Sequence, residues 1–205
     1  TGLGPEDPAY ARLNEAGELD TSLGDTQVLF DGRPAPLLYV QSRQINLQVP
    51  YEVFGRGTTE IEIRVAGQTK AFLVAAVAEV APAVFTASGG AGQAAAINQD
   101  GSANSAASAA PHGAIVALYA TGEGQRSPAG VSGRPAAAGQ VPLLPVSVTI
   151  GGEPAEILYA GAAPGYAGLM QVNARVPASL APGDQPVALR LGSAESQPGV
   201  TIAVR

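Results

Sequence analysis

The stretch Asp31–Tyr39, which reads DGRPAPLLY, returns 120 residues later as Gly151–Tyr159, which reads GGEPAEILY. A second match follows at an offset of 127 residues, between Gln44–Pro50 (QINLQVP) and Gln171–Pro177 (QVNARVP). The larger offset places seven extra residues in the second copy, between its two matched stretches. Self-similarity at a long, fixed spacing is typical of a chain that repeats one structural module. The sequence therefore predicts two copies of the same fold.

Apolar and polar residues alternate within both copies. In Gln44–Val49 the apolar Ile45, Leu47 and Val49 are separated by polar residues. A period of two is typical of a β-strand with one face on a core and the other in water. The same alternation occurs in three further stretches: 60–65, 146–150 and 187–191. The sequence thus predicts an all-β protein with two tandem β-sandwich domains.

The first copy lacks the opening part of the second. Thr1–Gly4 (TGLG) matches Thr121–Gly124 (TGEG), so nothing in the first copy corresponds to residues 81–120. Within those residues Ile115–Ala120 is apolar on both faces, which predicts a central strand covered on both sides. Further strands are expected over Ala83–Ala87 and around Ala95–Ile97.

These boundaries predict a complete domain over residues 81–205 and a domain over residues 1–80 that is incomplete at its N-terminus. Removing a central strand leaves unpaired backbone groups and an uncovered apolar face. We expect that face to be covered by a segment preceding Thr1, by the second domain, or by a strand from a neighbouring chain. Self-association through the open face of the first domain is therefore one expected partner interaction, and residues 81–205 are expected to fold alone.

Composition restricts the classes of partner. Charged residues make up 14% of the chain and hydrophobic residues 46%, with 26 glycines and 17 prolines, which indicates many short segments broken by turns. The net charge is −6, and a single lysine with scattered arginines makes nucleic acid a poor partner. The acidic start of the chain is interpreted as a solvated loop, with an acidic docking strip as the alternative. The chain contains no cysteine, which excludes disulfides and thiolate sites.

The sequence shows no segment for membrane insertion. No run approaches the roughly 20 apolar residues that span a bilayer. The chain also does not begin with a basic and then apolar signal segment, so an export signal is expected to lie outside this fragment.

Several motifs of the second copy resemble known families. The GGxPA motif at 151–155, the QVNxxVP motif at 171–177 and the closing strand 200–204 resemble the IPT/TIG class of immunoglobulin-like domains. The stretch Leu158–Asn173 and the motifs at 96–104 and 119–124 look like the Solibacter-type uncharacterised C-terminal domain family. This resemblance implies two immunoglobulin-like domains of an exported bacterial protein, located outside the cell or at its surface. It implies no established activity.

Candidate catalytic groups are sparse. His112 is the only histidine and lies in a Pro-His-Gly loop without an evident nucleophile nearby. Glu123, Glu153 and Glu156 could approach one another across a sandwich, but isolated surface acids are the favoured interpretation. We therefore predict no enzymatic activity, no catalytic residues and no cofactor.

A weak candidate metal site lies in the loop that contains Asn98, Asp100 and Asn104. These residues place oxygen ligands at alternate positions around a glycine, as calcium loops do. The loop has one carboxylate, so a hairpin in which these side chains bind their own backbone is favoured, and no metal site is predicted. Gly89–Gly92 lacks the lysine of a phosphate-binding loop and is interpreted as a flexible connection.

The candidate ligand-binding residues lie in or beside the insert of the second copy: Tyr166, Leu169 and Met170. Aromatic loop residues on a sandwich can stack on sugars or anchor a protein partner. The alternative is that Tyr166 and Leu169 fold back and cap one end of the core.

Three functions follow from these patterns. The favoured one is a non-catalytic spacer or interaction module that contacts a protein or a cell-surface polysaccharide. The alternative is a carbohydrate-binding module with a groove lined by Tyr166, Tyr10 or Tyr51. The third is an enzyme accessory domain or cryptic hydrolase, which would require two carboxylates about 5 to 10 Å apart in a cleft.

Overall fold

The structure is a computed structural model in which residues 2–205 are described. Strands make up nearly all of the regular structure, and the one helix among these residues is the 3-10 turn Tyr51–Val53 (η1). None of the described residues belongs to a helix long and apolar enough to cross a membrane. The predicted all-β class is confirmed, and the immunoglobulin-like topology stays a prediction.

Contacts between residues divide the chain into two compact units. Unit 1 contains the described residues up to Glu79 together with Ala129–Ala137 and Pro164–Gly168. Unit 2 contains the rest: Val80–Pro128, Ala138–Ala163 and Leu169–Arg205. Unit 1 therefore includes two segments that lie within the second repeat in the sequence.

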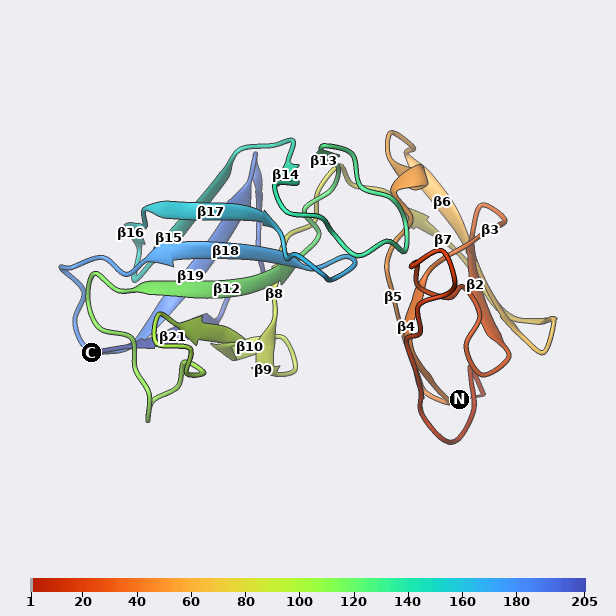
Figure 1. Cartoon of the computed structure of the whole chain (residues 1–205), viewed down its shortest axis with the longest axis horizontal. Coiled ribbons are helices and arrows are strands. Elements are labelled where there is room, and N and C mark those ends of the chain that lie inside the picture. The colour runs from red at the N-terminus through yellow and green to blue at the C-terminus, as the bar shows by residue number, and fades with distance from the viewer. Residues whose placement is uncertain (1) are drawn as a thin grey trace. The chain divides into compact units, whose positions relative to one another are not determined.

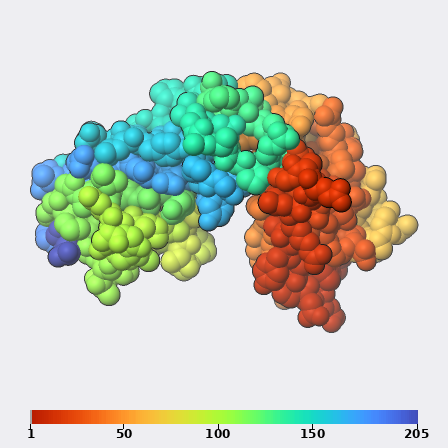
Figure 2. Space-filling model, in the orientation of Figure 1, coloured from red at the N-terminus to blue at the C-terminus, as the bar shows by residue number. Residues whose placement is uncertain are grey.

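Unit 1 has two antiparallel sheets (Figure 1). The first has the order β1-β4-β5, with β1 at Ala9–Tyr10, β4 at Leu37–Gln41 and β5 at Gln44–Leu47. The second has the order β3-β2-β6-β7, with β2 at Thr26–Phe30, β3 at Arg33–Pro34, β6 at Thr58–Val65 and β7 at Gln68–Ala76. The small core between them contains Val28, Phe30, Leu37 and Val40. Figure 2 shows the tip of the β6–β7 hairpin, coloured yellow-orange, projecting from the body of this unit.

Unit 2 has two larger sheets. The first has the order β11-β12-β18-β17, with β8 beside β12; the strands are β8 (Ala83–Val84), β11 (Ala96–Asn98), β12 (Ile115–Thr121), β17 (Ile157–Ala162) and β18 (Met170–Arg175). The second has the order β16-β15-β19-β21-β10-β9, with β20 beside β19; the strands are β9 (Thr86–Ser88), β10 (Ala91–Ala94), β15 (Val146–Ile150), β16 (Glu153–Pro154), β19 (Gly183–Leu191), β20 (Ala194–Glu195) and β21 (Val200–Val204). A separate short pair joins β13 (Arg126–Ser127) to β14 (Val141–Pro142). In Figure 1, β12, β18 and β17 run side by side, as their order in the sheet requires.

The matched stretches of sequence form matched strand pairs. Val28 of β2 faces Ile63 of β6, and Val148 of β15 faces Leu189 of β19. The two pairs β4–β5 and β17–β18 share an irregularity, which lies between Leu37 and Tyr39 in one and between Ile157 and Tyr159 in the other. The alternation read from the sequence therefore places equivalent side chains on equivalent faces.

The strand Ile115–Ala120 was expected to be central and covered on both sides; its central position is confirmed, but the face with Ile115, Ala117 and Tyr119 is only partly buried. β12 lies between β11 and β18, and its residues Val116, Leu118 and Ala120 have no exposed surface. The interpretation of Gly89–Gly92 as a flexible connection needs correction. β10 begins at Ala91 and pairs in parallel with β21, so only the turn at residues 89–90 is a connection. Glycine allows this strand to follow the turn directly, because residue 92 adopts a positive φ of 75°.

Candidate functional site

The most distinctive surface of the described chain is the open edge of unit 1. β18 of unit 2 has a strand on each side, β12 and β17, whereas its counterpart β5 pairs only with β4 and ends its sheet. β21 pairs with β10, whereas β7 pairs only with β6 and also ends its sheet. A strand edge presents a row of unpaired N–H and C=O groups that can pair with another strand.

Apolar side chains accompany these edges. Phe72, Leu73 and Val74 are consecutive residues of β7 with exposed fractions of 58%, 47% and 58%. Consecutive residues of a strand point to opposite faces, so both faces of β7 are open here. Ile45 and Leu47 of β5 are only partly buried. The open edge of unit 1, defined as β5 and β7, thus combines unpaired backbone with apolar surface.

A buried ion pair lies in unit 2. Arg126 Nε donates to Glu123 Oε1 at 2.7 Å, and the exposed fractions of the two side chains are 2% and 5%. The other carboxylate oxygen, Oε2, has no hydrogen-bond partner among the described residues. Burial raises the pKa of Glu123 above its usual 4.5, while the charge of Arg126 and its hydrogen bond act in the opposite direction. The interpretation of Glu123 as a surface acid was wrong, because the carboxylate is enclosed.

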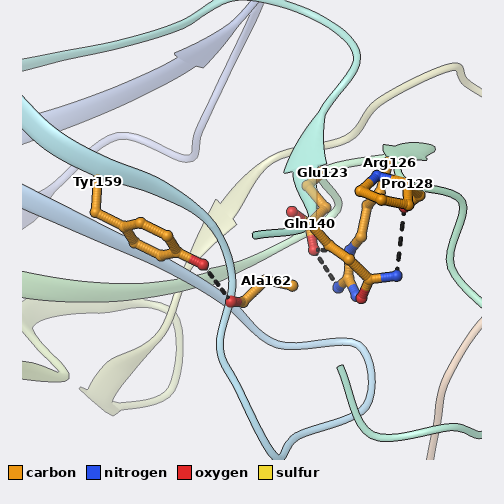
Figure 3. Close-up of polar contacts among 6 residues, drawn as sticks. All are labelled: Glu123, Arg126, Pro128, Gln140, Tyr159 and Ala162. Carbon is orange, nitrogen blue, oxygen red and sulfur yellow. Dashed lines mark hydrogen bonds and ion pairs between the residues drawn. The ribbon is translucent and has the colours of Figure 1, made fainter. Parts of the chain in front are cut away.

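Figure 3 also shows Tyr159 and Gln140, which have hydrogen-bond partners of their own. The Tyr159 hydroxyl donates to the Ala162 carbonyl at 2.6 Å, and Gln140 Nε2 donates to the Pro128 carbonyl at 3.3 Å. Burial, and then the nearby Glu123 charge, raise the pKa of Tyr159. A Cβ at Gly161 would lie 2.5 Å from the Gln140 carbonyl oxygen, so no side chain fits there. The packing indicates that this polar cluster holds loops in place.

The other two acids of the predicted carboxylate group have partners of their own. Glu156 Oε2 pairs with Arg175 Nε at 2.7 Å, and Glu153 accepts a hydrogen bond from the Ser179 hydroxyl. Among residues 2–205 no group of three or more His, Cys, Asp and Glu side chains could hold a metal ion. His112 is exposed in the turn before β12.

The loop with the weak metal candidates forms a hydrogen-bond network. Asn104 Nδ2 donates to Asn98 Oδ1 at 2.9 Å, so that oxygen is already engaged. Asp100 Oδ1 accepts from the backbone and the hydroxyl of Ser102, at 2.9 and 2.6 Å. These hydrogen bonds lower the pKa of Asp100. The arrangement matches the hairpin interpretation, in which such side chains bind their own backbone.

A hollow of about 850 Å³ lies beside this loop. Its lining includes Asn98, Asp100, Ser108, Asp184 and Arg205. None of the residues predicted to bind a ligand lines it.

The three predicted ligand-binding residues have different environments. Tyr166 is 61% exposed, Leu169 is partly buried, and Met170 has no exposed surface because it lies in β18 within the core of unit 2. Tyr166 therefore does not bury itself as the alternative interpretation expected. Full burial removes Met170 from the surface that a ligand can reach. Tyr10, which has 65% exposure, packs edge-on against Tyr39 with ring centroids 5.5 Å apart.

The segment 129–137 belongs to unit 1, and no pattern in the sequence indicated this. Gly133 N donates to Gln48 Oε1 at 2.8 Å, and Leu19 N donates to the Gly133 carbonyl at 2.8 Å. The Ser132 hydroxyl accepts a hydrogen bond from Tyr51 N at 2.9 Å. The residues joined by these hydrogen bonds lie far apart in the sequence; Tyr51 and Ser132, for example, are 81 positions apart. No local sequence pattern predicts such contacts.

Comparison with known proteins gives distant similarity only. No protein-family model matches the chain, and no curated protein sequence matches it. One similar solved structure is SGBP-B of the Bacteroides ovatus mixed-linkage glucan utilization locus in complex with a mixed-linkage heptasaccharide, with 14% identity, a TM-score of 0.30, and coverage of 98% of this chain and 41% of that chain. Another is surface layer protein SbsC, domains 4-9, with 13% identity, a TM-score of 0.29, and coverage of 95% of this chain and 25% of that chain. The chain spans less than half the length of either structure.

Proposed function

We propose that this chain is a non-catalytic spacer or interaction module, built from two immunoglobulin-like sandwiches, in an exported bacterial protein located at the cell surface. The observation that carries the proposal is that each of the two units is built from several separate segments of the chain. The polypeptide passes from one unit to the other five times, at the junctions 79/80, 128/129, 137/138, 163/164 and 168/169. A single linker would allow each sandwich to act alone, whereas repeated covalent passages suit a part that keeps two modules associated.

The segment 129–137 is fastened within unit 1 by both backbone and side-chain bonds. Gly133 is bonded through both its N–H and its carbonyl, and Arg134 pairs with Glu18 at 2.7 Å. Ala136 N donates to the Tyr166 carbonyl at 2.9 Å, which ties the segment 164–168 to it. The polar groups of these segments are thus used for construction, in keeping with a spacer.

Replacement of Gln48 tests the fastening. Gln48→Ala removes the acceptor of the Gly133 N–H, and Gln48 is only 6% exposed. We expect unit 1 to lose about 1 to 3 kcal/mol of unfolding free energy, because a buried donor is left unsatisfied. Limited proteolysis should then cut within residues 129–137 faster than in the parent chain.

Gln44→Ala is the matched control, because Gln44 lies four residues before Gln48 at the start of β5, is exposed, and donates its side-chain hydrogen bond to the exposed Asn46. We expect this variant to change stability by less than about 0.5 kcal/mol. Equal effects of the two variants on proteolysis would count against a fastened segment.

Assays on glycoside, ester and peptide substrates test the non-catalytic part of the proposal. We expect no turnover. Reproducible turnover that is lost in Glu123→Gln or Glu153→Gln would overturn it.

A carbohydrate-binding module is the second candidate, and one observation favours it. Tyr166 and Tyr10 are both large, exposed aromatic side chains of unit 1, and such rings stack on sugars. A glycan array probed with the parent chain, Tyr166→Ala and Tyr10→Ala tests this candidate. Binding that survives both substitutions, or no binding by the parent chain, would reject it.

A further inference from the structure

One of the strand edges at which the two repeats differ is that of β5, and unit 2 shows what occupies the corresponding edge. β12 pairs with β18 through six residue pairs, from Ile115 opposite Arg175 to Ala120 opposite Met170. β5 corresponds to β18 through the matched QINLQVP and QVNARVP stretches. The edge of β5 that corresponds to the β12 side has no strand beside it in the part of the chain that the structure describes.

Burial records the effect of the neighbouring strand. Val172 and Ala174 of β18 have no exposed surface, and they face Leu118 and Val116 of β12, which also have none. Their counterparts Ile45 and Leu47 are only partly buried. The four side chains are all apolar, so we attribute the difference to the missing neighbour.

The path of the chain near its described start indicates where a covering strand would enter. Gly2 and Gly122 hold the same place in the TGLG and TGEG motifs and adopt nearly equal φ angles, 79° and 78°. A Cβ at Gly122 would lie 1.8 Å from the Ala81 carbonyl oxygen, whereas a Cβ at Gly2 would meet nothing within 4 Å. The space next to Gly2 is thus open where the opening segment of unit 2 fills it.

A hydrogen bond places Leu3 beside the N-terminal end of β5, which is where a covering strand would need to end. Leu3 N donates to the Ser42 carbonyl at 3.2 Å, in the turn between β4 and β5. In unit 2, β12 ends directly before Gly122, with Ala120 opposite Met170, just where β18 begins. A strand running into Thr1 would therefore reach the start of β5 with the same direction and register as β12.

We propose that the free edge of β5 is a docking site for one antiparallel β-strand that is covalently continuous with Thr1 and apolar on both faces. In unit 2, Leu118 lies opposite Val172 and Val116 lies opposite Ala174. In the same register, the residue three positions before Thr1 would lie opposite Ile45, and the residue five positions before Thr1 would lie opposite Leu47. The strand completes the sheet in the order β1-β4-β5-docked strand. This site is independent of the spacer function, which rests on the segments of the second repeat.

Extending the full chain tests the docking site. A copy of residues 81–120 is fused directly before Thr1, which reproduces the sequence relation between β12 and Thr121. We expect the unit 1 transition to rise by about 5 °C or more, because one kcal/mol moves the midpoint of a small domain by roughly 4 to 8 °C. Amide hydrogen exchange of residues 44–47 should slow by at least about 10-fold, since paired edge amides are protected.

The matched control is the same fusion with Val116→Asp and Leu118→Asp in the copied strand only. The backbone length is unchanged, but two charges would face Ile45 and Leu47. We expect the exchange of residues 44–47 to return to the rate of the unextended chain. The substitution Gly2→Ala gives a second test. It should lower the stability of unit 1 only slightly in the unextended chain, but strongly in the fusion, because the carbonyl of the copied Ala81 would then occupy the space next to residue 2.

Three results would overturn the proposal. The first is a folded fusion whose unit 1 transition and β5 exchange equal those of the unextended chain. The second is protection of residues 44–47 in the unextended chain that grows with its concentration, because a second copy would then be the occupant. If the fusion fails to fold, a free peptide with the sequence of residues 111–120 is added to the unextended chain. The third contradicting result is then that amide exchange of β5 is not slowed by this peptide.

Discussion

Ile63 in unit 1 and Leu189 in unit 2 occupy equivalent positions, because each faces the valine of a matched strand, Val28 or Val148. Leu189 has no exposed surface, whereas Ile63 is partly exposed. Both strands carry the same alternation of apolar and polar residues. Alternation therefore determines which face of a strand points inward, and the neighbouring strands determine how completely that face is covered.

The largest expected difference between the units concerns their matched glycines. Gly122→Ala should destabilise unit 2 by about 4 kcal/mol or more, because a Cβ there would overlap the Ala81 carbonyl and the positive φ adds strain. Gly2→Ala should cost about 1 kcal/mol, because it brings the φ strain alone. Urea unfolding of both variants measures the difference.

Gly152→Ala serves as the control within unit 2, because its φ is 81° and nothing lies within 4 Å of its Cβ position. Its cost should match that of Gly2→Ala. A Gly122→Ala protein as stable as Gly152→Ala would show that the opening segment does not pack against residue 122.

The equivalent core positions provide the next comparison. Leu189→Ala should cost about 3 kcal/mol or more, since a fully buried leucine leaves a cavity. Ile63→Ala should cost about 1 to 2 kcal/mol, because part of that side chain is already in contact with water. Equal losses, measured from urea midpoints, would mean that unit 1 is closed in solution.

One carboxyl group in each unit should affect stability in opposite directions as the pH changes. The pKa of Asp31 in unit 1 is lowered by the hydrogen bond from the Glu60 backbone N–H and then by that from the Thr59 hydroxyl. Its stabilising effect is present above the unfolded value of 3.8 and is lost as the pH falls through the lowered folded value. Unit 1 should therefore weaken in acid.

Glu123 in unit 2 has a raised pKa, so the sign is reversed. As the pH rises through 4.5 the unfolded chain releases this proton before the folded one does, and stability falls until the folded carboxyl also ionises. Glu123→Gln should remove this decline in the unit 2 urea midpoint between pH 4 and 7. A decline that is unchanged in the variant would assign it to another group.

The smallest effect is expected at the exposed tyrosine. Tyr166→Ala should change the unfolding free energy by less than about 0.5 kcal/mol, because the ring is 61% exposed. Met170→Ala, four residues further along the chain, should cost about 2 to 5 kcal/mol because the methionine is fully buried. A loss of several degrees in the melting temperature of Tyr166→Ala would show that the ring caps a core after all.

The features that the sequence predicted correctly have a local cause. A period of two located β5, β6, β15 and β19, and an uninterrupted apolar run located β12 as a strand with neighbours on both sides. These patterns report how single strands meet a core, which is a property of consecutive residues.

The features that were missed depend on distant residues. Glu123 looks like any turn acid in TGEG, and only the folded chain shows it buried beside Arg126. The bond between Gln48 and Gly133 joins residues 85 positions apart. The alternation of apolar and polar residues carries no information about which loop contacts which sheet. The segments that make up unit 1 could therefore not be predicted from it.

The inclusion of residues 129–137 and 164–168 in unit 1 has a consequence for the order in which the protein can be completed during synthesis. A ribosome releases the chain from its N-terminus, so unit 1 makes its last contacts only after Gly168 has emerged. By then the chain has already delivered β8 to β17, which belong to the other unit. The unit that is first in the sequence therefore cannot be completed by its own first 79 residues, and its apolar strands remain open to other nascent chains until residue 168 has emerged.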